Sequence, residues 1–475
     1  MTTRKISTFL KSEKMPIFAL LAISFFARLI LYKDYDLLWD SAVYTSMGKY
    51  IYTMGKIGLW EPIRPLLWPL IMGGIWRLGL DVIRWGRVLE IFFSLGAIYF
   101  VYQIGRHLAD RKTGLIAALL LSFSPNFFAW GNIHLTSIPS SFFVMCGLYL
   151  FMRSSYLSSG ILMALAAMTR FPQGIIFISA LFFMALHWRI YRPQLKEASK
   201  FLWGFALVVA PFLVVNQLLY GDILLPFKMG SAAVEKDSYA WLGHTNIYYL
   251  KKLLGENLLL TLALPGFIYG FRKKEPMMRL LLISTLFITL YYASLVHKEF
   301  RYLLVILPFL YLMSALAIGQ LHSFCSNRSK MGPLLILAVV ASIWIHPFPR
   351  QVEVQFSLRR TLPHENYLYL EKNKIEGEIW TSNPRFTVNS DVRVDELIYF
   401  GFGAERAKWL REHLDRAELV FVDTRDFPCA PGDEACDIEK SKFMDALKER
   451  FDCAAGASTT QFETGIYRKT EPSKR

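Results

Sequence analysis

Residues 277–320 read MMRLLLISTLFITLYYASLVHKEFRYLLVILPFLYLMSALAIGQ, and this stretch decides the fold. Two apolar runs, 277–296 and 302–320, flank a short polar turn. Each run has close to the length of about 20 residues that a helix needs to cross the hydrocarbon core of a bilayer. The pattern predicts two membrane-spanning helices joined by a compact charged turn. The ionisable residues of this turn are His297, Lys298, Glu299 and Arg301.

The same apolar pattern recurs along most of the chain. Of the 475 residues, 54% are hydrophobic and 19% are charged, whereas ordinary soluble domains carry about 25% charged residues. The sequence therefore predicts an α-helical polytopic membrane protein with about eleven transmembrane helices. The spans are predicted at residues 16–32, 88–108, 114–130, 137–152, 160–169, 174–188, 201–220, 257–271, 277–296, 302–320 and 332–346.

The distribution of charge predicts the topology. Lys and Arg total 53 against 38 Asp and Glu, and the excess lies in short segments between apolar runs, such as GRHLADRKTG and FRKKEPMMR. Because basic loops stay in the cytoplasm, we expect a cytoplasmic N-terminus, with the first outer loop (residues 33–87) and the C-terminal tail outside the cytosol. Such placement of charge indicates a multi-pass membrane protein with no nucleic-acid partner. The membrane can be the plasma membrane or the endoplasmic reticulum, and the charges do not distinguish between them.

Residues 66–80 form an apolar stretch that breaks this alternation of loops. A full span here would place the basic segment GRHLADRKTG on the outer face. We therefore expect a helix that lies along or dips into the outer interface. A full span, with the alternation restored elsewhere, is the alternative.

The character of the sequence changes after the last apolar run. Residues 1–347 are predicted to form the membrane domain, and residues 348–475 a small outer α/β domain. In the latter, EIWTS, ELIYF, AELVFVD and TTQFETGIYRK are typical of strands, and AERAKWLREHLDR and KSKFMDALKERF of amphipathic helices. Cys429, Cys436 and Cys453 cluster there, which predicts one disulfide and one remaining thiol, with Cys429 and Cys436 as a possible pair.

The first outer loop carries the candidate catalytic residue. Asp40 opens an amphipathic helix that places Tyr44 on the same side. One interpretation makes Asp40 a helix N-cap, and the other makes it a general base beside the lipid. Further along, Glu61 and Arg64 form either a surface ion pair that braces the loop or, through Arg64, a contact to an anionic lipid phosphate.

Two other polar turns supply candidate anion-binding residues. Arg170 follows an apolar helix in AAMTRFPQG, and it either extends to lipid headgroups or binds phosphate. The HKEFR turn concentrates cationic groups that neutralise phosphate, with an interfacial anchor as the alternative. His134, in GNIHLT, has the features of a structural histidine. No metal-ligand spacing, glycine-rich phosphate loop or nucleophile elbow occurs in the sequence, so we expect no metal and no cofactor.

These motifs resemble the C-type superfamily of polytopic glycosyltransferases, which use lipid-phosphate sugars. HKEFRYLLVILP is similar to the HKE-x-R-[FY] signature of dolichyl-phosphate-mannose-dependent α-mannosyltransferases, and the outer α/β tail resembles that of protein-mannosyltransferase-like relatives. GLWEPIRPLLWPL, WDSAVY and LAAMTRFPQG resemble further family segments within residues 16–320. Two features differ: LTSIPSS lacks the acidic residue that many relatives have there, and the first loop lacks their paired Asp-Glu.

The resemblance implies a mechanism and a set of partners. Asp40 would deprotonate an acceptor hydroxyl, which attacks the anomeric carbon of a polyprenyl-phosphate sugar, most simply mannose, with inversion. The lipid tail would lie near residues 66–80, and a lipid-linked or glycan acceptor would receive the sugar. The implied ligands of the departing phosphate are Arg64, Arg170, His297, Lys298 and Arg301, supported by Glu61, Glu299 and Tyr44.

Three alternatives remain at the level of the sequence. The acceptor can instead be a protein hydroxyl or a membrane lipid. A lipid or glycolipid flippase would also be polytopic and basic, but transporters usually place ionisable residues near the membrane midplane, whereas the predicted spans are almost free of charge at their centres. An inactive accessory subunit would share the fold and lose Asp40.

Overall fold

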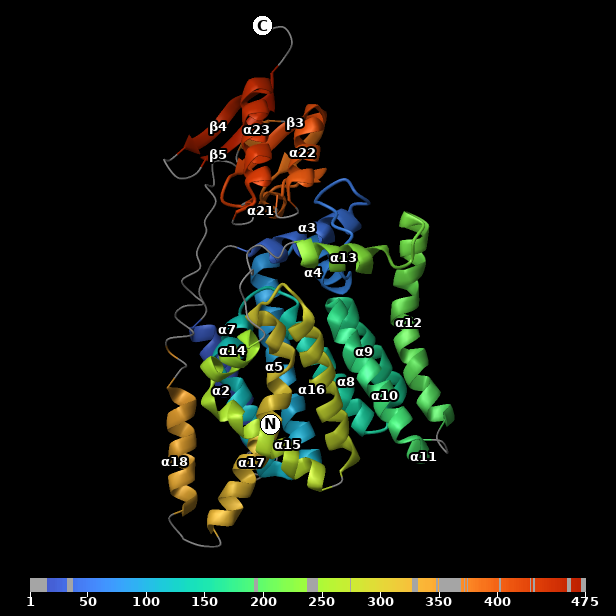
Figure 1. Cartoon of the computed structure of the whole chain (residues 1–475), viewed down its shortest axis with the longest axis vertical. Coiled ribbons are helices and arrows are strands. Elements are labelled where there is room, and N and C mark those ends of the chain that lie inside the picture. The colour runs from blue at the N-terminus through green and yellow to red at the C-terminus, as the bar shows by residue number, and fades with distance from the viewer. Residues whose placement is uncertain are drawn as a thin grey trace, which may run out of the picture.

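The computed structural model describes residues 15–31, 37–191, 195–236, 247–273, 275–326, 332–346, 375–400, 403–427, 432–458 and 463–470, with single positions at 349, 369, 370, 372, 373 and 429. A bundle of long helices forms one end of the molecule and a small α/β domain the other (Figure 1). Helices α3, α4 and α13 lie across the end of the bundle, below the α/β domain.

The helices of the first 346 residues follow the predicted apolar runs, with extra breaks. Pro125 occupies the first position of α7 and separates it from α6, because proline has no N–H to continue a helix. The helices are α2 (Met15–Ile30), α3 (Trp39–Tyr52), α4 (Leu67–Arg77), α5 (Val82–Leu108), α6 (Arg111–Ser122), α7 (Pro125–Trp130), α8 (Ser137–Met152), α9 (Tyr156–Thr169), η1 (Phe171–Gln173), α10 (Gly174–Leu186), α11 (Trp188–Tyr191), α12 (Leu195–Tyr220), α13 (Leu225–Lys236), α14 (Tyr248–Glu256), η4 (Leu258–Leu262), α15 (Ala263–Arg272), α16 (Pro276–Ser294), η5 (Phe300–Val305), α17 (Leu307–Ser326) and α18 (Gly332–Ile345).

Not every predicted span is long enough to cross a bilayer unaided. Among the described residues, α5, α12, α16 and α17 are long and apolar enough to cross. The pair formed by α14 and the segment Leu258–Arg272 also passes, but it bends by 112° at the break. Helices α2, α8 and α9, together with the segment Phe171–Leu186, are apolar but shorter. The chain is a helical membrane protein, and the count of eleven spans stays a prediction.

Helix α4 corresponds to the apolar stretch at residues 66–80. It packs against α3, and the two backbones approach closely where Gly48 faces Gly73. A Cβ atom on Gly48 would lie 2.5 Å from the backbone of Gly73, so only glycine permits this contact. Helices α3 and α4 therefore form a rigid pair across the end of the bundle (Figure 1).

The α/β domain contains a five-stranded sheet with the strand order β2-β1-β3-β5-β4. Strand β1 pairs in parallel with β2 and β3, whereas β5 pairs antiparallel with β3 and β4. All the predicted strands and both helices occur, and β4 was not predicted. The elements are β1 (Glu378–Thr381), α21 (Arg385–Asn389), β2 (Glu396–Leu397), α22 (Ala404–Glu412), η6 (Leu414–Arg416), β3 (Ala417–Asp423), α23 (Glu434–Arg450), β4 (Phe451–Ser458) and β5 (Glu463–Lys469).

The two faces of this sheet have different partners. Successive side chains of a strand point to opposite faces. Val420 and Val422 of β3 share a core with residues of α22 and α23. Phe421, between them, packs in a second core that includes Val43 and Met47 of α3. The α/β domain thus shares part of its hydrophobic core with the first loop of the membrane domain.

The predicted cysteine chemistry is confirmed. Cys429 and Cys436 form a disulfide, and Cys453 is a free, exposed thiol.

Candidate active site

A large cavity lies between the helix bundle and the α/β domain. Its volume is about 2010 Å³. Its walls come from the first loop, from the turns at Arg170 and His297, from α10, α12, α13 and α16, and from the α/β domain. The predicted residues Asp40, Tyr44, Glu61, Arg64, Arg170, His297 and Arg301 all line it.

Asp40 lies at the centre of the charged part of the cavity. It sits in the first turn of α3, where Leu38 occupies the N-cap position, so the N-cap interpretation of Asp40 is wrong. One carboxylate oxygen accepts from Nη2 of Arg64 at 2.9 Å. The other accepts a short hydrogen bond from Nη1 of Arg301. Residues from two distant loops therefore meet at this one carboxylate.

Two further carboxylates balance these arginines. Glu61 Oε2 lies 2.5 Å from Nε of Arg64. Glu299 pairs with Arg301 through both of its oxygens, and its Oε1 also lies 2.7 Å from Nε2 of His297. The supporting roles predicted for Glu61 and Glu299 therefore correspond to ion pairs that hold Arg64 and Arg301 in place. The ion pair of Glu61 with Arg64, one of the two interpretations of the first loop, therefore occurs, and Arg301 is neutralised in the same way.

Arg170 differs from the other two arginines because it makes no ion pair within the described residues. Its Nη1 donates to the Ser137 hydroxyl at 2.9 Å, and its guanidinium lies over the ring of Tyr302, 4.7 Å from the centroid. Neither contact neutralises its charge. Arg170 is therefore the residue of the bundle best suited to receive an anion.

Three other predicted residues have distinct positions. Tyr44 lies under Arg64, with its ring centroid 5.4 Å from the guanidinium carbon. Lys298 is buried, and its ammonium donates to the Leu295 carbonyl instead of lining the cavity. His134 is fully buried, with Nε2 at 2.6 Å from the sulfur of Met72, which agrees with a structural role. Asp34 and Asp36, the neighbours of Asp40 in the first loop, lie outside the described residues.

The arginines decide the ionisation of Asp40. Burial alone would raise the pKa of this carboxyl, but the charges of Arg64, Arg301 and Arg170 outweigh burial and hold the pKa well below its usual range. For Glu299, the Arg301 charge likewise outweighs burial and lowers the pKa. Asp40 is therefore an ionised but weakly basic carboxylate.

This ionisation predicts the acid side of the pH profile. Because a lowered pKa keeps Asp40 ionised down to pH values below the ordinary value of about 3.9, log(kcat/KM) for the donor is expected to show no acid limb from this group between about pH 5 and pH 8. Initial rates at limiting donor across this interval test the expectation. A limb of unit slope inside the interval, with protein stability unchanged, would contradict the assignment of a low pKa to the base.

The side of the cavity toward the bundle is apolar. It is lined by Ile175, Phe177 and Ile178 of α10, Phe205 of α12 and Leu295 after α16. No residue of α4 (Leu67–Arg77) lines it. A lipid chain that enters this cavity would therefore lie against α10, α12 and α16, and the path near residues 66–80 stays a prediction.

The α/β domain contributes a polar wall that sequence reasoning missed. Several of its residues follow β1 or β3 at the carboxyl ends of parallel strands, a position where binding residues collect in α/β proteins. The cavity-lining residues that directly follow a predicted strand in the sequence are Asn383 and Arg385 in TSNPRF, and Arg425 and Asp426 in VDTRDF. This position could have identified them. Within the described part of the chain, no group of three or more His, Cys, Asp or Glu residues is placed to hold a metal ion.

Comparisons with known proteins agree with the fold described above. The family model of dolichyl-phosphate-mannose-protein mannosyltransferases matches residues 63–216. ArnT from Cupriavidus metallidurans, in a structure with bound undecaprenyl phosphate, is similar with a TM-score of 0.65 at 10% identity over 97% of this chain and 99% of that chain. The apo oligosaccharyltransferase from Archaeoglobus fulgidus is similar with a TM-score of 0.62 at 13% identity, over 97% and 75% of the two chains. No curated protein matches the sequence.

Proposed function

We propose that this chain is a member of the C-type superfamily of polytopic membrane glycosyltransferases and that it transfers a sugar from a polyprenyl-phosphate donor to a lipid-linked or glycan acceptor. The observation that carries the proposal is the position of Asp40 and three arginines where the apolar and polar parts of one cavity meet. A polyprenyl-phosphate sugar fits this order, because its apolar chain, its phosphate and its sugar match the apolar part, the arginines and the polar part of the cavity in turn.

The proposed reaction is a single displacement. An acceptor hydroxyl attacks the anomeric carbon of the donor sugar and forms the new glycosidic bond. The bond between that carbon and the phosphate oxygen breaks, and the phosphate leaves with the electron pair. Asp40 takes the hydroxyl proton, and the configuration at the anomeric carbon is inverted. A cation beside the leaving phosphate stabilises the charge that develops there.

The ion pairs of Asp40 suggest how this carboxylate becomes a stronger base when the donor binds. A donor phosphate beside Arg170 competes with Asp40 for Arg64 and Arg301, because all three arginines act on this carboxylate. Loss of arginine contacts raises the pKa of a carboxylate. Donor binding would thus convert Asp40 from a weak base into a stronger one at the moment when a base is needed.

The sugar and the acceptor are proposed separately. The matched family model describes mannosyltransferases, which favours mannose as the sugar. A protein hydroxyl is a second candidate acceptor, because the same description names protein mannosyltransferases. We favour a glycan or lipid-linked acceptor since the wall from the α/β domain carries both carboxylates and arginines, such as Glu405, Asp426 and Arg425. Hydroxyl groups can donate to the former and accept from the latter.

The proposed function predicts sugar transfer by the purified full-length protein. With radiolabelled polyprenyl-phosphate mannose and a membrane lipid extract, label is expected to move into the lipid fraction. Polyprenyl-phosphate glucose and a protein extract serve as the alternative donor and acceptor. Label in protein would favour the second candidate acceptor. Transport of the labelled donor across vesicles without any transfer would contradict the proposal and favour a flippase.

A further inference from the structure

Arg385 of the α/β domain makes no ion pair with any residue that the structure describes. Arg385 is only 8% exposed, yet it lines the cavity. The other lining arginines of this domain are paired: Arg406 with Glu396 and Arg425 with Asp423.

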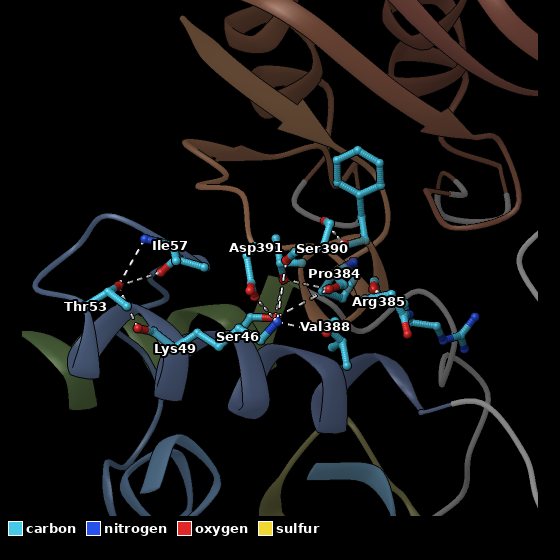
Figure 2. Close-up of polar contacts among 12 residues, drawn as sticks. Ser46, Lys49, Thr53, Ile57, Pro384, Arg385, Val388, Ser390 and Asp391 are labelled. Atoms are coloured by element: carbon cyan, nitrogen blue, oxygen red, sulfur yellow. Dashed lines mark hydrogen bonds and ion pairs between the residues drawn. The ribbon is translucent and has the colours of Figure 1, made fainter. Parts of the chain in front are cut away.

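The backbone around Arg385 is held firmly against α3. Figure 2 shows the short helix α21 above α3, with polar contacts between them. The Ser46 hydroxyl bonds to that of Thr387. Lys49, which is 2% exposed, donates to the Val388 carbonyl at 2.9 Å and to Asp391 at 3.0 Å. The pKa of Lys49 is lowered overall, because the effect of burial outweighs that of the Asp391 carboxylate.

The side chain of Arg385 is oriented by a single contact. Its Nε donates to the backbone carbonyl of Leu37, three positions before Asp40 in the chain. This contact uses the inner nitrogen of the guanidinium and leaves the two terminal nitrogens for other partners. A group bound to those nitrogens would lie beside the start of α3, where the proposed base is found.

A buried guanidinium without an anion is costly, unless a ligand supplies the opposite charge. We propose that Arg385 binds an anionic group of the acceptor, with phosphate as the class that best matches its two parallel N–H donors. This inference rests on the proposed function, because it assigns the acceptor to the side of Asp40 opposite the donor. The donor phosphate belongs to Arg170, on the bundle, and the acceptor anion to Arg385, on the α/β domain.

The first experiment needs no knowledge of the acceptor. Purified full-length protein is saturated with undecaprenyl phosphate, which occupies the donor site. Inorganic phosphate or acetate is then added, and the change in thermal unfolding temperature is measured. A second anion site gives further stabilisation, because a ligand that binds only the native state raises stability by mass action. Acetate instead of phosphate as the better ligand would identify a carboxylate as the acceptor group.

The variants separate binding from folding. Arg385→Gln is expected to lose the additional stabilisation by phosphate while keeping that by undecaprenyl phosphate. Arg385→Lys keeps a positive charge and a donor for the Leu37 carbonyl but loses the two parallel N–H donors of arginine. Its stabilisation by phosphate is expected to be intermediate between those of the wild type and Arg385→Gln. Arg416→Gln is the control, because Arg416 is an exposed arginine of the same domain, paired with Glu378 outside the cavity.

A transfer assay then tests the link to the acceptor. Arg385→Gln is expected to raise the acceptor KM at least tenfold and to leave the donor KM within twofold. Phosphatase treatment of the lipid extract is expected to raise the acceptor KM of the wild type in the same way as the substitution does. It is expected to change the acceptor KM of Arg385→Gln little. Unchanged phosphate stabilisation in Arg385→Gln would overturn the inference. A second anion site in a protein that transfers no sugar would instead refute the proposed function alone.

Discussion

Asp40→Asn is expected to lower kcat for sugar transfer by at least about a hundredfold, in the range that general-base catalysis contributes. The amide has nearly the shape of the carboxylate but cannot accept the proton of the acceptor hydroxyl. Arg64 and Arg301 keep Glu61 and Glu299 as partners in this variant, so the site should retain its architecture. Rates at saturating donor and acceptor give the effect on kcat.

Donor binding supplies the control for this prediction. Removal of one negative charge from between two arginines favours an anion, so undecaprenyl phosphate should bind Asp40→Asn as tightly as the wild type or more tightly. Asp415→Asn changes an exposed carboxylate far from the cavity and should leave kcat within twofold. If Asp40→Asn keeps the wild-type rate, Asp40 serves only to position the arginines.

Arg170→Gln is expected to lower kcat/KM by about two to three orders of magnitude, the usual cost of removing one donor that stabilises charge in a transition state. Among the three arginines of the membrane domain that line the cavity, Arg170 is the one without a carboxylate partner in the described residues, so its charge is the most available to the leaving phosphate. Arg170→Lys keeps the charge but loses the planar geometry, and an intermediate value is expected. Steady-state kinetics with polyprenyl-phosphate mannose measure the effect.

Arg153→Gln is the matched control, because Arg153 is an exposed arginine after α8 that does not line the cavity. A loss in Arg170→Gln that is confined to thermal stability, with kcat/KM unchanged after correction for folded protein, would show that Arg170 only joins Ser137 to Tyr302. Equal losses in both variants would indicate a general effect of basic residues on the membrane domain.

Much of the candidate site was accessible from the sequence because its residues occur at the ends of apolar runs. Asp40, Arg64, Arg170 and Arg301 each interrupt or follow such a run, where a charge has to lie outside the hydrocarbon. The turn HKEFR carried the resemblance to the C-type glycosyltransferases. Lys298 shows the limit of this reasoning. It is a cation of the same turn as Arg301, yet its ammonium donates to the Leu295 carbonyl and does not line the cavity.

The interaction partners of these residues could not be predicted from the sequence. That Asp40 is shared by Arg64 and Arg301, which lie 24 and 261 positions away, follows only from the packing of the first loop against the turn before α17. The pKa of Asp40 depends on this arrangement and could not be inferred from its neighbours in the chain. Arg385 was missed because the sequence does not show that a buried arginine will have no acidic partner among the described residues.

The sequence by itself determined that the chain is a helical membrane protein with a small α/β domain and with charged turns at the outer ends of its apolar helices, because hydrophobic length and alternation are local properties. The tertiary structure alone decided that one face of the β-sheet packs on α3 and that the apolar side of the cavity lies beside α10, α12 and α16. It also decided that Arg170 and Arg385 have no acidic partner among the described residues. These are properties of contacts between distant segments, and a charge is neutralised or left available by what packing brings within a few ångströms of it.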